Sequence, residues 1–207
     1  MGVAEPTIRR YLDTLTQTLM VRQLQPWHEN LGKRQVKAPK IYFRDTVLLH
    51  MLMGVKYLAE LVTHPSCGAS WEGFALEQVL RIARPDEAFF WATHQGAELD
   101  LLMLKGRQRI GVEFKRADAP RLTHSMRIAM HDLKLDALYV VYPGSHRYEI
   151  ADGVEAVPLW ALLPGSQYQL PQLTPAARSP VSHRLPGLPA NRPRPAAPGR
   201  TGCVPDR

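Results

Sequence analysis

The sequence has little cysteine and no long apolar run. Its two cysteines, Cys67 and Cys203, are too few for a disulfide framework or a cysteine-based zinc site. The longest apolar stretch, residues 47–55, is about half the length that a bilayer-spanning helix needs, and it contains His50. The N-terminus also lacks the basic-then-apolar pattern of a secretory signal. We therefore expect a cytoplasmic protein that does not contact a membrane.

The sequence also lacks a nucleotide-binding signature. A P-loop requires Gly-x-x-x-x-Gly-Lys-[Ser/Thr], whose backbone amides surround phosphates. The one Gly-Lys pair, Gly32 and Lys33, is followed by Arg34, and Trp27 stands where the first glycine should be. There is no Gly-rich dinucleotide fingerprint and no Ser-His-Asp elbow, and the eight histidines have no metal-ligand spacing. These absences exclude a P-loop ATPase site in this chain.

Positive charge is concentrated at the C-terminal end. The net charge is +7, but residues 164–207 hold six arginines and one acid and so contribute +5 of it. The same 44 residues hold ten of the 18 prolines. Such a segment buries too little apolar surface to offset its conformational entropy, so we expect residues 164–207 to be a disordered, solvated tail. The nearly neutral remainder makes the pI of 9.6 poor evidence for DNA binding.

Residues 1–45 show the pattern of a partial winged helix. The spacing predicts a helix from an N-cap at Thr7 through residue 20, then strands over residues 20–24 and 40–43. The connection between the strands is basic, and Lys33, Arg34 and Lys37 are candidate contacts to nucleic-acid phosphates. A solvated loop is the alternative interpretation. The two helices with which a winged helix normally starts are missing.

Residues 46–163 alternate between helical and strand periodicity. The predicted elements are a helix over 47–62, a loop over 65–70, a helix over 71–82, strands over 88–93, 97–104 and 108–116, a helix over 122–133, a strand over 137–142, and a strand, hairpin or short helix within 148–162. From residue 71 onward this is an α-β-β-β-α-β order. An α/β (α+β) fold is therefore expected.

One hairpin carries the residues that suggest chemistry. Alternation along a strand places Glu113 and Lys115 on one side. If the turn is centred between residues 106 and 107, the residue numbers of each cross-strand pair add up to about 213. This register sets Asp100 opposite Glu113. Directly opposed side chains lie about 5 Å apart at Cβ. Two carboxylates that close require a positive partner, either a divalent metal or the ammonium of Lys115.

This layout suits metal-assisted phosphodiester hydrolysis. Asp100 and Glu113 would be ligands of Mg²⁺ or Mn²⁺, because Mg²⁺ prefers oxygen donors and binds through one or two carboxylates plus phosphate. Lys115 would orient the attacking water and balance the developing negative charge. The alternative is an amphipathic hairpin that shows these three side chains to solvent without any chemistry.

The element order and the spacing of these residues resemble the PD-(D/E)XK restriction-endonuclease-like nucleases. The resemblance implies that Asp100, Glu113 and Lys115 are the catalytic triplet of that family. It also implies a further acid on the preceding helix, for which Glu72 is the best match and Glu77 the alternative. Leu99 replaces the proline of the nominal motif, a change that the family tolerates.

A narrower resemblance covers nearly all of residues 1–163. The matching segments are residues 6–12, 30–34, 40–45, 72–74, 96–100 and 112–116. They resemble the C-terminal domain of unknown function in a large prokaryotic AAA+-type ATPase family, which implies a winged-helix remnant joined to a nuclease-like domain.

By this resemblance the chain lacks the N-terminal ATPase core, so we expect a truncated gene product, with an ATPase core supplied elsewhere as a possible partner. The predicted function is that of a DNA-interacting, Mg²⁺-dependent nuclease. The alternatives are a non-catalytic DNA-binding or docking module and a truncated fragment without a function of its own. The sequence does not indicate the oligomeric state.

Overall fold

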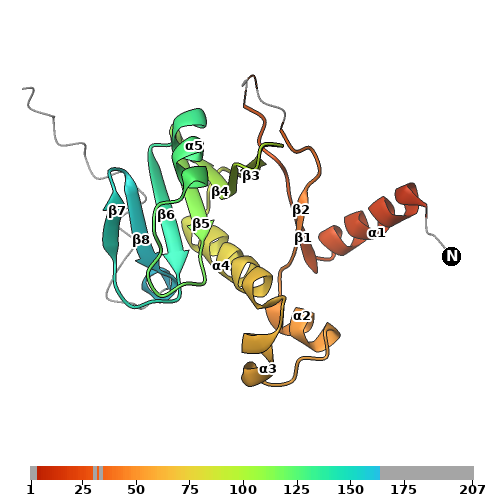
Figure 1. The fold of residues 1–207 in the computed structure, drawn as a ribbon. Coiled ribbons are helices and arrows are strands. Elements are labelled where there is room, and N and C mark those ends of the chain that lie inside the picture. The colour runs from red at the N-terminus through yellow and green to blue at the C-terminus, as the bar shows by residue number, and fades with distance from the viewer. Residues whose placement is uncertain (1–3, 30–31, 33–34, 164–207) are drawn as a thin grey trace, which may run out of the picture. The chain divides into compact units, whose positions relative to one another are not determined.

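The structure is a computed structural model that describes residues 4–29, 32 and 35–163 (Figure 1). Its central element is a six-stranded mixed sheet in the order β3-β4-β5-β6-β8-β7. The strands are β3 (Glu87–Ala92), β4 (Glu98–Lys105), β5 (Gln108–Phe114), β6 (Ala137–Tyr142), β7 (Tyr148–Ala151) and β8 (Val154–Pro158). Neighbours β5, β6 and β8 pair in parallel, and the other pairs are antiparallel. The predicted mixed α/β fold class is confirmed at this level.

A helix packs on each face of the sheet. Helix α4 (Cys67–Ala83) contributes Leu76 and Val79 to one apolar cluster, which also holds Met103 and Val141. Helix α5 (His124–Asp132) contributes Met126 to a second cluster. Because neighbouring strand residues divide between the two clusters, the sheet is buried on both faces, as expected for parallel strands.

The N-terminal segment contributes to the first of these clusters. Helix α1 (Glu5–Gln17) precedes a two-stranded antiparallel sheet of β1 (Val21–Leu24) and β2 (Lys40–Phe43). Leu24 and Tyr42 are buried among residues of α4 and the large sheet. The chain between β1 and β2 also bonds to the edge strand β3, since the Trp27 amide donates to the Phe90 carbonyl at 2.6 Å. The predicted order of helix, strand, connection and strand is therefore present.

Several predicted boundaries are wrong. Helix α1 begins at Glu5 with Ala4 as N-cap, not at Thr7, because Pro6 already fits the first turn of a helix. The single helix predicted over residues 47–62 is two helices, α2 (Thr46–Leu52) and α3 (Leu58–Thr63). Gly54 lies between them with φ +76°, a conformation that ends a helix. Helix α4 starts at Cys67, inside the loop predicted over residues 65–70.

The remaining predictions agree closely with the structure. Strand β6 has the predicted ends, and the other strands of the large sheet that were given bounds differ by one or two residues at their ends. The last region is a hairpin of β7 and β8 followed by a short 3₁₀ helix, η1 (Leu159–Leu162). The predicted tail, residues 164–207, lies outside the described residues. Within the described part, no helix is long and apolar enough to cross a membrane.

Candidate functional site

The β4–β5 hairpin has the register that its sequence predicts. Its turn contains two residues, and the residue numbers of each pair from Leu101–Val112 to Lys105–Gln108 add up to 213. Gly106 takes φ +59° at the first central position, as a type II′ turn requires. The pairing ends at Leu101 and Val112, one position before Asp100 and Glu113.

A bulge in β4 lies directly at Asp100. Between the pairs Phe89–Leu102 and Trp91–Leu99, β3 has one residue, Phe90, and β4 has two, Asp100 and Leu101. An extra residue of this kind bends the strand and redirects a side chain, and such bulges are frequent beside active sites. The carboxylate of Asp100 accepts a hydrogen bond from the Phe114 amide at 3.0 Å, which fixes it against the end of β5.

Asp100 and Glu113 are both buried, with exposed fractions of 7% and 3%. The Glu113 carboxylate pairs with the ammonium of Lys115 at 2.8 Å. Val112 and Phe114 lie in the cluster under α4, so the predicted alternation along β5 is present. Burial raises the pKa of Glu113 to about 8, the Asp100 carboxylate adds to this rise, and Lys115 opposes it.

Helix α4 brings Glu72 to the same place. Its Oε1 accepts a hydrogen bond from the Tyr42 hydroxyl and lies 3.4 Å from Nζ of Lys40. Glu77, the alternative acid on this helix, forms ion pairs with Arg22 and Arg44 instead. The structure therefore places Glu72, and not Glu77, beside the hairpin.

Three residues of the site were not predicted to belong to it: Lys40, Tyr42 and Glu98. The ammonium of Lys40 contacts the carboxylates of Glu98, Glu72 and Asp100, the last at 3.5 Å. Burial alone would lower the pKa of Lys40, but the nearby carboxylates, Glu72 foremost, raise it above its ordinary value. Burial and Glu72 likewise raise the pKa of the Tyr42 hydroxyl.

We call Glu72, Glu98, Asp100 and Glu113 the carboxylate cluster. It has two ammonium partners, Lys115 beside Glu113 and Lys40 beside the other three. In residues 4–29, 32 and 35–163, no three Asp, Glu, His or Cys side chains are arranged to hold one metal ion. Asp100 and Glu113 remain as a pair of adjacent oxygen donors, which is the set that Mg²⁺ uses when water and phosphate supply its other ligands.

The candidate nucleic-acid contacts are only partly described. Lys33 and Arg34 lie outside the described residues, and Lys37 is exposed. The residues on either side of them are held on β3: the Val36 amide donates to the Ala92 carbonyl at 3.0 Å. The predicted contact to nucleic acid stays a prediction.

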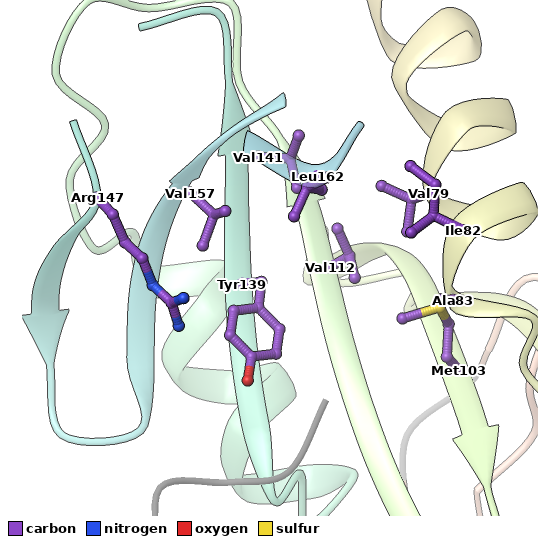
Figure 2. Close-up of a pocket in the computed structure, with 10 residues that line it drawn as sticks. All are labelled: Val79, Ile82, Ala83, Met103, Val112, Tyr139, Val141, Arg147, Val157 and Leu162. Atoms are coloured by element: carbon purple, nitrogen blue, oxygen red, sulfur yellow. The ribbon is translucent and has the colours of Figure 1, made fainter. Parts of the chain in front are cut away.

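A separate apolar pocket lies between α4 and the sheet (Figure 2). Its walls are mostly aliphatic, and none of its lining residues belongs to the carboxylate cluster. The lining residues are Val79, Ile82, Ala83, Met103, Val112, Tyr139, Val141, Arg147, Val157 and Leu162. The Arg147 guanidinium at its edge already pairs with Glu155. The pocket therefore offers no free charged group to a substrate, and the carboxylate cluster is the better candidate for chemistry.

Comparison with known proteins finds two domains of unknown function. Residues 67–162 match the family described as DUF4143, and residues 1–59 match DUF8612. The site draws on both matched segments, because Lys40 and Tyr42 lie in the first 59 residues and the carboxylate cluster lies in residues 67–162.

Two mycobacterial proteins are similar to most of this chain. They are the uncharacterized proteins Rv2008c of Mycobacterium tuberculosis and Mb2031c of Mycobacterium bovis, each 50% identical over 158 residues. The match covers 76% of this chain and 36% of each relative, so the chain spans about a third of the length of these proteins. No solved structure matches the chain significantly.

Proposed function

We propose that residues 1–163 form a nuclease-like unit that hydrolyses phosphodiester bonds of DNA with the help of Mg²⁺ or Mn²⁺. The observation that carries this proposal is the buried pair of Asp100 and Glu113 with Lys115 beside it. The order α4-β3-β4-β5-α5-β6 supports a PD-(D/E)XK type of core around this pair. The α1, β1 and β2 segment would be the remnant of a winged helix, and the ATPase core would be supplied by another part of a longer protein or by a partner.

In this proposal Asp100 and Glu113 hold the ion through their carboxylate oxygens. The bound ion would polarise the phosphate and lower the pKa of a water molecule. Lys115 lies 2.8 Å from Glu113, where its ammonium can hold the attacking water and offset the negative charge that develops on phosphorus-bound oxygen. The water oxygen would bond to phosphorus and give up one proton to solvent, the P–O ester bond would break, and the leaving oxygen would take up a proton from solvent.

Glu72 has a supporting role in this scheme. It contacts Tyr42 and Lys40 and not the Asp100–Glu113 pair, so it would orient the neighbouring groups and not bind the ion. A second candidate function is a non-catalytic DNA-binding or docking module. The ion pairs of Lys40 favour it, because they already neutralise part of the carboxylate cluster.

A plasmid-nicking assay with Mg²⁺ or Mn²⁺ separates the two functions. The protein is compared with Asp100→Asn and Lys115→Met, and with Glu87→Gln as a control, because Glu87 is exposed on β3. We expect metal-dependent nicking that falls by at least about 100-fold in the first two variants and stays unchanged in the control. Folded protein that does not nick DNA, or nicking that survives both substitutions, would refute the nuclease function and favour the non-catalytic module.

A further inference from the structure

Lys40 is the charged residue of the site that comes from outside the α4–β6 region, and it shares strand β2 with Tyr42. It lies on β2, where pairing with β1 fixes the strand, and its Nζ is also 5.5 Å from the centre of the Phe90 ring. Phe90 is the residue that faces the bulge containing Asp100. Lys40 is therefore held in place over the β4 bulge by its strand and by an aromatic ring.

The Lys40 ammonium lies between three carboxylates. It contacts one oxygen each of Glu72, Glu98 and Asp100, and it does not contact Glu113. Its side chain is about three-quarters buried. Asp100 is shared: its Oδ1 lies 3.5 Å from Lys40, while its Oδ2 receives the Phe114 amide at the end of β5, where Glu113 lies.

Two-metal hydrolases place their ions about 3.5–4 Å apart on a shared carboxylate. Asp100 is in the position of such a shared ligand, with Glu113 on one side and Glu72 and Glu98 on the other. The second side is the one that Lys40 fills. We propose that Lys40 is a positioning residue that acts as the resident cation of the carboxylate cluster and limits the site to one divalent ion. This inference rests on the proposed metal-dependent function.

Several properties support this assignment. The ammonium of Lys40 lies within ion-pair distance of three carboxylates, those of Glu72, Glu98 and Asp100. A fixed ammonium repels a second cation and at the same time removes the mutual repulsion of three carboxylates. In addition, Tyr42 on the same strand donates a hydrogen bond to Glu72, so β2 positions this carboxylate as well as the ammonium.

The test counts Mn²⁺ ions bound per folded chain, by electron paramagnetic resonance and by calorimetry. The full chain is compared with Lys40→Met, Lys40→Arg, which keeps the charge, and Lys56→Met as a control at an exposed lysine. We expect about one ion for the wild type, Lys40→Arg and Lys56→Met, and about two ions for Lys40→Met. The thermal midpoint of Lys40→Met should be lowered without metal and should rise more with Mn²⁺ than that of the wild type.

The possible outcomes separate this inference from the proposed function. One ion in both the wild type and Lys40→Met would overturn the role of Lys40 and leave a one-metal site standing. No ion in either protein would overturn both. An ion bound by Lys40→Met but not by the wild type would support exclusion by Lys40 and overturn the proposed function. If Lys40→Met does not fold even with Mn²⁺, Lys40→Gln carries the same comparison, because its amide keeps a donor to the carboxylates without the charge.

Discussion

Glu113 links the site to the pH dependence of folding. Its pKa is raised to about 8 by burial and by Asp100, whereas an unfolded chain leaves a glutamate near its ordinary value of 4.5. The folded protein therefore binds a proton that the unfolded chain releases between these two values. The stability from this group is complete below about pH 4.5 and is lost as the pH rises to about 8.

Glu113→Gln should remove this loss. Between pH 5 and 8 the free energy of unfolding of the wild type should fall by an amount on the order of a few kcal/mol. The free energy of unfolding of the variant should fall less over the same range. Urea titrations at several pH values measure both slopes. Glu87→Gln, at an exposed position, should keep the wild-type slope. Equal slopes in the wild type and Glu113→Gln would show that Glu113 keeps its ordinary pKa in the folded protein.

At the residue scale, local patterns predicted only part of the site. Strand alternation was enough to place Lys115 beside Glu113. The hairpin register predicted Asp100 near Glu113, and Asp100 does act on the pKa of Glu113, but the observed pairing ends one position earlier, at Leu101 and Val112. Lys40 lies 60 residues before Asp100 in the sequence, and its contact depends on how β2 packs on the rest of the fold. Spacing between neighbouring residues carries no information about such packing, although Lys40 and Tyr42 already share one side of a predicted strand.

At the element scale, the edge of the large sheet depends on the chain between β1 and β2. Gln35 is central to this attachment: its Oε1 accepts hydrogen bonds from the Trp91 indole at 3.1 Å and from the Glu29 amide at 2.9 Å. Trp91 is fully buried in β3. The indole N–H therefore depends on Gln35 for its partner, since water does not reach it.

Gln35→Leu should lower the free energy of unfolding by about 1–3 kcal/mol, because a buried N–H loses its acceptor. Urea titration followed by tryptophan fluorescence would measure the change. Gln17→Leu on the exposed side of α1 should change stability by no more than about 0.5 kcal/mol. A loss below that level in Gln35→Leu would mean that this segment does not hold the edge of the sheet.

The differences between predicted and observed elements have local physical reasons. Strands with uninterrupted apolar residues, such as β6, had clear ends in the sequence. The region of α2 and α3 kept helical periodicity across Gly54, so periodicity alone did not reveal the break. Six large apolar side chains of this region are exposed in the structure, and a pattern of apolar residues does not say which of them a core will cover. They are Val47, Met51, Leu52, Tyr57, Leu58 and Val62.

At the scale of the whole molecule, the N-terminal segment and the large sheet share one apolar cluster. Leu24 and Tyr42 are buried against α4 and the sheet, and Val36 packs against the same cluster. Lys40 adds an electrostatic contribution, because without it three carboxylates would lose their common partner. The sequence predicted a division at residues 45 and 46, and this division stays a prediction.

A chain of residues 46–163 alone should fail to unfold cooperatively. This shorter chain would lack the N-terminal residues that pack against α4, so apolar surface of α4 and the sheet would become exposed. Its buried carboxylates would also lack their partner Lys40. Circular dichroism during heating would test this. A chain of residues 1–163 is the control and should melt like the full chain, because the residues of both apolar clusters lie within it. Cooperative melting of residues 46–163 at the same temperature would instead establish two independent domains.

The hairpin turn at Gly106 has two residues. With a turn of this length, whether the number of positions between two residues is odd or even shows whether they lie on the same side of the hairpin. In a hairpin whose paired residue numbers add up to an odd number, residues of opposite strands that share one side of the sheet are separated along the chain by an odd count. The spacing of 13 positions from Asp100 to Glu113 is odd. Deletion or insertion of one strand residue between either carboxylate and the turn would send that carboxylate to the opposite side, while a search that allows variable gaps would still find the motif. Among related chains with a turn of this length, only those with odd spacing would retain the paired carboxylates.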